Sequence, residues 1–111
     1  MTKEMREPTF AIMSALAEGP RHGYAIITEA RELSGGSVAL QPGTLYAALD
    51  RLRSEGLVDI TSEEVVKGRL RRSFALTDRG LEALSAEATR RREIAERALA
   101  RLRARANGAP A

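Results

Sequence analysis

The sequence predicts a mainly α fold of the α+β type, a winged helix-turn-helix followed by a long C-terminal helix. Three observations predict this fold. The segment that begins at Gln41-Pro42-Gly43 carries leucines at helical spacing, two short strand-like segments follow it, and apolar residues recur with a seven-residue period from Leu81 onward. A helix-turn-helix followed directly by a two-stranded hairpin is the element order of winged-helix folds.

Length and composition limit the protein to one small domain. Its 111 residues include no cysteine, which excludes disulfides and thiolate metal sites. The longest apolar stretch, around Phe10–Ala17, is too short to cross a bilayer. We therefore expect a cytoplasmic protein without membrane contact. Residues 1–76 are expected to form the winged-helix unit, residues 77–106 the last helix and residues 107–111 a frayed tail.

The first two helices are predicted over Pro8–Glu18 and Gly23–Leu33. Proline suits the first helical turn, and Gly19-Pro20 ends the first helix. Apolar residues lie on more than one side of the first helix, which predicts burial against a second chain. In the second helix we expect Tyr24 to lie in the core. The sole histidine, His22, is expected to cap or pack the turn before it.

The next elements are a third helix and a two-stranded hairpin. Leu45, Leu49 and Leu52 form the inward stripe of the third helix, and Gly56 suits the left-handed position after it. Short strands are predicted over Val38–Leu40, Leu57–Thr61 and Leu70–Leu76, the last two joined by a long polar tip over residues 63–69. Thr77 is expected to cap the last helix, which runs to about Arg105.

The last helix is too long and too exposed to be covered by a domain of this size. Its apolar seam predicts a homodimer in which the first helix also takes part. The expected interface consists of Phe10, Met13, Leu81, Leu84, Ala88, Arg91, Ala95, Leu99 and Leu102.

Charge and helix orientation favour double-stranded DNA as the partner. The net charge is +3, and the segment Lys67–Arg72 holds four cations and no acid. With its leucines inward, the third helix turns Thr44, Ala47, Asp50 and Arg51 outward and Tyr46 towards one flank. Lys67, Arg69 and Arg71 surround the expected wing tip, where they would neutralise phosphates.

Less specific interpretations of the same residues stay open. Basic residues also form ordinary solvated faces, and cations on an edge strand deter aggregation. A winged-helix protein could use the same surface, or its long helix, to bind another protein. No paired carboxylates, nucleophile–base pair or phosphate-binding glycine loop is evident, so we expect no enzyme, no cofactor and no metal site.

Several motifs together resemble the PadR family of transcriptional regulators over about Phe10 to Leu84. They are His22-Gly23-Tyr24, Pro42-Gly43-Thr44-Leu45-Tyr46, Leu49-x-x-Leu52, Glu55-Gly56-Leu57, Arg71-Arg72 and Leu76-Thr77-x-x-Gly80. The shortness of the chain and its single C-terminal helix resemble the smaller members. The resemblance implies a homodimer that represses transcription at a two-fold operator. It places DNA contacts at Thr44, Tyr46 and the wing cations, with Lys3 and Arg6 as phosphate contacts.

The resemblance also implies a small-molecule effector at the dimer interface, but two positions depart from the family pattern. Where some short members carry an aromatic residue midway along the last helix, this chain has Arg91, and it has no tryptophan. A stacked planar drug is therefore not expected there. Arg91 would pair with Glu87 across the interface or bind an anion, and we favour the pairing. Phe74 stands where the family often has tyrosine.

Overall fold

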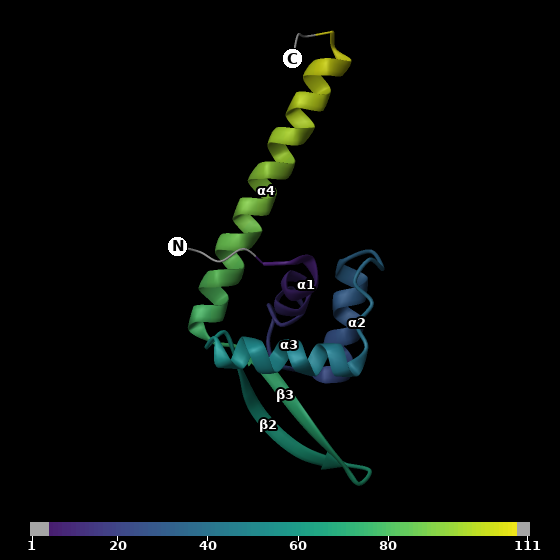
Figure 1. The fold of residues 1–111 in the computed structure, drawn as a ribbon, viewed down its shortest axis with the longest axis vertical. Coiled ribbons are helices and arrows are strands. Elements are labelled where there is room, and N and C mark those ends of the chain that lie inside the picture. Colours follow the sequence, from purple (N-terminus) through teal and green to yellow (C-terminus); the bar gives the residue numbers. More distant parts are fainter. Residues whose placement is uncertain (1–4, 109–111) are drawn as a thin grey trace.

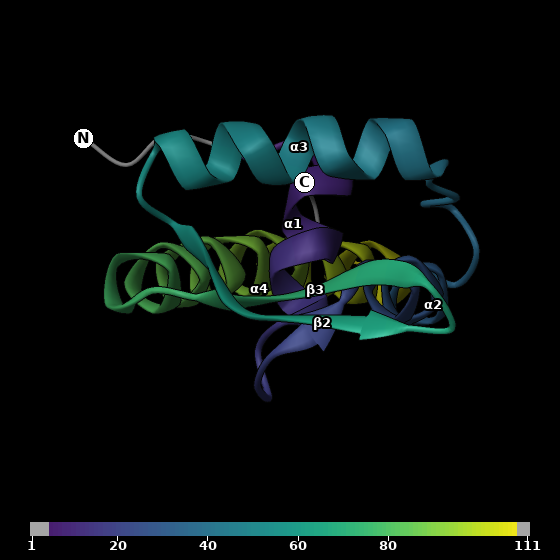
Figure 2. The same ribbon diagram turned by 90° about the horizontal axis from the view of Figure 1, so that it is seen from below.

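A computed structural model describes residues 5–108 and confirms the expected α+β winged-helix fold. Along the chain the elements are α1 (Glu7–Ala15), β1 (Arg21–His22), α2 (Gly23–Leu33), α3 (Pro42–Ser54), β2 (Val58–Val66), β3 (Arg69–Leu76) and α4 (Asp78–Ala106). In Figure 1 the β2–β3 hairpin leaves the helical body on one side and α4 leaves it on the other. Seen from below, α3 forms one side of the molecule (Figure 2).

Local sequence chemistry sets the helix ends. Pro42 stands in the first turn of α3, where its missing N–H costs no hydrogen bond. The Thr77 side chain caps α4 by accepting a hydrogen bond from the Gly80 N–H at 3.0 Å. His22 caps α2 in the same way, since its Nδ1 accepts from the Ala25 N–H at 3.3 Å. The expected caps at positions 22 and 77 are thus confirmed.

The core lies where α1, α2, α3 and the base of the hairpin meet. Its fully buried side chains include Ile12, Met13, Ile26, Leu45, Leu49, Leu52 and Val58, joined by Phe74. A smaller cluster of Ala11, Ala30 and Val38 packs on the other side of α1. Helix α1 is therefore buried on more than one side by its own chain. This corrects the expectation that its all-round apolar surface requires a second chain.

The three-stranded sheet has the order β1–β3–β2, and both pairings are antiparallel. The strand beside β3 is the two-residue Arg21–His22, whereas Val38–Leu40, expected as a strand, is irregular. A register shift between Ile60 and Ser62 bends β2. Beyond the bend the two strands stay paired as far as Val66 and Arg69, so the expected long polar tip is wrong.

Helix α4 begins against the body and then projects from it. Ala83 and Leu84 in its first turns pack on the core. Its 29 residues correspond to a rod about 43 Å long, and the molecule measures 64 × 30 × 21 Å. The far half of α4 touches no other element in Figure 1. Among residues 5–108, no helix is both long and apolar enough to cross a membrane.

Candidate nucleic-acid interface

Helix α3 presents the surface that the leucine stripe predicts. Leu45, Leu49 and Leu52 are buried, which fixes the rotation of the helix about its axis. Thr44 and Ala47 consequently lie exposed on the opposite side. Their small side chains leave the helix backbone open to close approach by a groove of DNA.

Arg51 also lies exposed, but it is engaged at the other end of α3. Its Nη1 lies 3.1 Å from Glu55 Oε1, and its Nη2 donates to the Thr9 hydroxyl at 2.8 Å. The side chain therefore ties α3 to the beginning of α1. Arg51 could contact DNA only by breaking these bonds. We therefore assign Arg51 the role of positioning α3 against α1.

Tyr46 is partly exposed, and the rest of its ring packs against neighbouring residues. Its ring is 45% exposed, and its centroid lies 6.2 Å from that of Phe74. A Cβ placed on Gly23 would come within 2.5 Å of the Tyr46 hydroxyl, so the ring lies directly on the glycine backbone. Two motifs that are separate in the sequence, at residues 22–24 and 42–46, thus meet in one contact that sequence reasoning missed.

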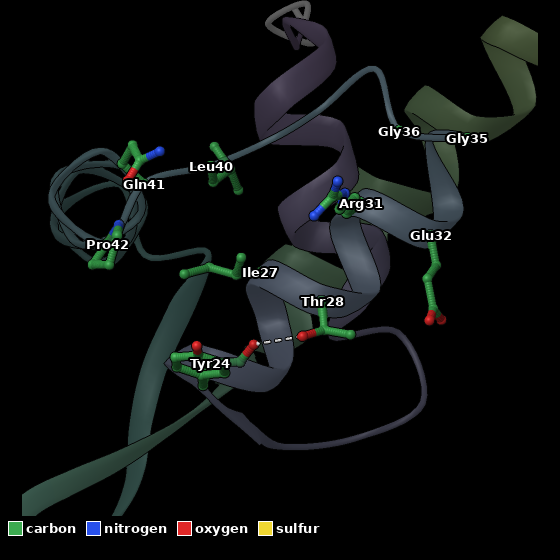
Figure 3. A pocket seen from close by; sticks show the side chains of 10 residues that line it. All are labelled: Tyr24, Ile27, Thr28, Arg31, Glu32, Gly35, Gly36, Leu40, Gln41 and Pro42. Carbon is green, nitrogen blue, oxygen red and sulfur yellow. Dashed lines mark hydrogen bonds between the residues drawn. The ribbon is translucent and has the colours of Figure 1, made fainter.

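Tyr24, expected in the core, is instead 77% exposed at the beginning of α2. It borders an open groove of about 650 Å³ between α2 and the segment that leads into α3 (Figure 3). The groove is lined by Tyr24, Ile27, Thr28, Arg31, Glu32, Gly35, Gly36, Leu40, Gln41 and Pro42. The expectation failed because helical spacing alone does not say which side of Gly23 is covered, and α3 covers the side next to Tyr46.

The wing ends in a two-residue turn formed by Lys67 and Gly68. Both have positive φ, 51° and 77°, as a type I′ hairpin turn requires. Lys67, Arg69 and Arg71 are exposed, as expected for phosphate contacts. Among residues 5–108 no acidic side chain lies within ion-pair distance of Lys67 or Arg69.

Farther from the tip the wing is neutralised by its own strand partner. Arg72 Nε lies 3.0 Å from Glu63 Oε1, and Glu64 stands opposite Arg71 in the strand register. These two glutamates offset half of the four cations. The end of the hairpin is therefore the positive part of the wing, a distribution that the sequence run from Lys67 to Arg72 did not reveal.

The N-terminal phosphate contacts can be placed in part. Arg6 is exposed and directly precedes α1. Lys3 lies outside the described residues.

Seven of the nine expected dimer residues fall into two groups. Leu81, Ala88, Ala95, Leu99 and Leu102 are exposed on α4, together with Ile94. Met13 is fully buried in the core of its own chain and Leu84 is partly buried there, so Met13 presents no side-chain surface to a partner. Its assignment to the interface is corrected accordingly.

Glu87 on α4 is buried, with 1% of its surface exposed, and it holds two arginines. Arg90 donates to both carboxylate oxygens at 3.0 and 2.8 Å, and Arg91 Nε donates to Oε2 at 2.8 Å. The hydrogen bond from Arg90, with that from Arg91, outweighs the desolvation of the carboxylate and lowers the pKa of Glu87 from 4.5 to about 2. The carboxylate therefore stays ionised at neutral pH.

Arg91 connects Glu87 to residues near the start of the chain. Its Nη2 donates to the Met5 carbonyl at 2.6 Å, and its guanidinium lies 4.2 Å from the centre of the Phe10 ring. The pairing of Arg91 with Glu87, expected across the dimer interface, is formed within one chain. These contacts join Glu87, Arg90, Arg91, Met5 and Phe10 into one group, the Glu87 cluster.

Two of the relatives of this chain are described as transcriptional regulators. The profile of the Transcriptional regulator PadR-like family matches residues 12–86. Transcriptional regulator Rv3488 of Mycobacterium tuberculosis is 36% identical over 88 residues, which cover 79% of this chain and 78% of that protein. An uncharacterized 37.1 kDa protein in transposon TN4556 of Streptomyces fradiae is 47% identical over 77 residues, 69% of this chain. The chain spans 21% of that Streptomyces protein.

The solved structures agree in fold. A PadR family transcription regulator of Clostridium difficile superposes with a TM-score of 0.70 at 28% identity, over 87% of this chain and 99% of that one. Bacillus subtilis PadR in complex with operator DNA has a TM-score of 0.64 at 24% identity, over 73% of this chain and 46% of that one. The family consists of transcriptional regulators, in agreement with the expectation of no enzyme. The chain belongs to the PadR-like family of transcriptional regulators.

Proposed function

We propose that this protein is a homodimeric repressor that binds a two-fold symmetric operator in the cytoplasm. The observation that carries the proposal is the combination of the exposed face of α3, with Thr44 and Ala47, and the unneutralised cations Lys67 and Arg69 at the wing end. A helix fits the major groove, and cations on a neighbouring hairpin neutralise phosphates. Bacillus subtilis PadR, which shares the fold, was solved with operator DNA.

The two parts of the chain have different roles, DNA binding and dimerisation. Residues 1–76 bind DNA, and the helix over residues 77–106 joins two protomers. The exposed apolar side chains of α4 support the second task, because a helix that projects into water with Leu99 and Leu102 uncovered gains stability from a partner. Two-fold pairing would place two copies of α3 on successive turns of the duplex.

Release by a small-molecule effector bound between the protomers completes the proposal. Arg91 on α4 combines a cation with an aromatic ring, because its guanidinium lies over Phe10. Because Glu87 already holds Arg91, an acidic effector would have to compete with that carboxylate. Small molecules that reduce operator binding without dissociating the dimer are the expected effectors.

Salt dependence of binding to the DNA upstream of the protein's own gene tests the proposal. Replacing Lys67 and Arg69 together with alanine removes two phosphate contacts per protomer. Each lost contact is expected to reduce the slope of log affinity against log salt by about 1. The double variant should bind all DNA sequences more weakly and depend less on salt.

Substitutions on α3 test base readout separately. Thr44→Ala should lose more affinity for the operator than for random DNA, because its hydroxyl lies where it can meet a base edge. Tyr46→Phe removes the hydroxyl and keeps the packing on Gly23 and Phe74, so it is preferred to Tyr46→Ala. Equal losses on both kinds of DNA would mean that α3 only positions the protein. Absence of sequence preference at every salt concentration would refute the repressor proposal and leave a protein-binding role.

A further inference from the structure

The wing ends in an apolar pair that the fold does not use. Val65 and Leu70 stand directly opposite each other on β2 and β3, one residue before the residues that flank the turn. Val65 is 72% exposed and Leu70 is 56% exposed. Neither packs on the core clusters, which take their hairpin residues from the base of the strands, such as Val58 and Phe74.

The residues around the pair are apolar or basic, a combination that suits the minor groove of DNA. Residues 65–70 hold three apolar side chains, the cations Lys67 and Arg69, and no acid. Such an end is poorly suited to water and repels other positive surfaces. The minor groove of DNA offers apolar deoxyribose walls between two rows of phosphates, and proteins that enter it commonly insert apolar side chains. The pair and its flanking cations complement both parts of that surface.

The glutamates farther up the wing limit how deep it can enter. Glu63 and Glu64 begin directly behind Val65, and Glu63 is bonded to Arg72. The acid-free end therefore comprises two residues of each strand, about 7 Å at the rise of a β-strand. The minor groove is about 7.5 Å deep. The length of the acid-free end is thus similar to the depth of the groove.

We infer that Val65 and Leu70 contact the sugar walls of the minor groove beside each half-site, so that part of the wing's affinity does not depend on salt. The inference rests on the proposed DNA binding and adds residues to it. Lys67 and Arg69 contact the phosphates on either side, while the apolar pair excludes water from the groove.

The test replaces both apolar residues with serine. Their side chains are exposed at the free end of the hairpin, so Val65→Ser/Leu70→Ser should keep the thermal unfolding midpoint of the unaltered protein. We expect the affinity for the operator to fall about tenfold, which corresponds to about 1.4 kcal/mol. The salt slope should stay unchanged. The matched control is Lys67→Ala/Arg69→Ala, which removes two phosphate contacts from each protomer and should lower the slope of the dimer by about 4.

Modified DNA locates the contact. Replacing guanine with inosine beside the half-sites removes the amino group on the minor-groove floor and leaves the major-groove acceptors in place. Affinity of the unaltered protein should rise at the flanking positions where the wing enters, and the double serine variant should not respond.

The outcomes separate the inference from the proposed function. Equal operator affinity of the unaltered protein and the serine variant would overturn the inference while DNA binding stands. A salt slope that falls with the serine variant would also overturn it. Loss of self-association, with DNA affinity retained, would make the pair a protein contact instead. If the unaltered protein binds no operator, the proposed function itself fails.

Discussion

Glu87 is a buried charge that fixes the direction in which α4 leaves the body. Its two arginine partners neutralise it, and Arg91 extends the contact to Met5 and Phe10. Sequence alone places Glu87 and Arg91 four residues apart, a spacing that permits a pair within one helix or one between helices. The choice between them depends on α1, which packs beside α4 and places Phe10 under the Arg91 guanidinium.

Glu87→Gln tests this cluster through the pH dependence of stability. Because the folded-state pKa, about 2, lies below the usual 4.5, ionised Glu87 stabilises the fold fully above pH 4.5 and progressively less as the pH falls towards 2. With screening at the partly exposed arginines, we expect a loss on the order of 2 kcal/mol at pH 7. The difference from the unaltered protein should shrink at pH 3. Urea unfolding at one protein concentration measures it.

Glu82→Gln is the control, since Glu82 lies exposed on the same helix. Its effect on the free energy of unfolding should be small. A Glu87→Gln effect that persists unchanged at low pH would show that shape, rather than charge, carries the contribution of Glu87.

Lys67 adopts a backbone conformation that is unfavourable for lysine, which suggests that its charge is kept for DNA binding. Non-glycine residues other than Asn and Asp rarely adopt positive φ, and asparagine would fit this turn position better. Lys67→Asn should therefore keep or slightly raise the free energy of unfolding, by up to about 0.5 kcal/mol. Operator affinity should fall, and the salt slope of the dimer should drop by about 2, because each protomer loses one phosphate contact. Titrations at several salt concentrations measure both.

Lys67→Arg retains the charge and should bind like the unaltered protein. If Lys67→Asn binds the operator as tightly as the unaltered protein, Lys67 does not contact DNA.

At the scale of elements, the predictable features are those set by local chemistry. The helix beginning at Pro42, the cap at Thr77 and the inward leucines of α3 follow from short-range rules. The hairpin itself was predicted, but its tight two-residue turn was not, because Lys67-Gly68 is not among the strongest turn pairs. Strand β1 consists of two residues and has no pattern of its own.

The candidate site was predictable to the same degree. Outward residues such as Thr44 and Ala47 follow from the period of α3. The bonds of Arg51 to Thr9 and of Arg72 to Glu63 join segments distant in sequence, so they need the folded chain. Burial of Met13 likewise depends on the neighbours of α1.

Gly80 is the point at which α4 crosses the segment between α3 and the wing. A Cβ there would collide with the Leu57 carbonyl, which also accepts a hydrogen bond from the Thr77 N–H at 3.0 Å. Because backbone on both sides would have to move, Gly80→Ala should lower the free energy of unfolding by about 2–3 kcal/mol. Chemical denaturation measures the loss.

Gly43→Ala provides the matched comparison in α3. A Cβ at Gly43 meets nothing within 4 Å, so this variant should be neutral or more stable by up to about 1 kcal/mol. Similar stability of the two variants would mean that the crossing at Gly80 adjusts easily.

At the scale of the whole molecule, α4 determines how two DNA-binding units are spaced. The proximal part of the helix is held by the Glu87 cluster, and the distal part extends from the body with an apolar stripe exposed (Figure 1). A dimer built on this stripe would convert the fixed angle of α4 into a fixed distance between two α3 helices. Leu84 is unsuited to test it, because the side chain also packs on the core.

Leu99→Glu/Leu102→Glu therefore tests the dimer without disturbing the body. Both leucines are exposed in the protomer, and burying two carboxylates in an apolar seam is unfavourable. Sedimentation should show monomers, and operator affinity should fall because each monomer engages one half-site. Arg97→Glu changes the net charge equally on the opposite side of α4, so it should remain dimeric. A dimeric leucine variant, or a monomeric Arg97 variant, would place the interface on another face.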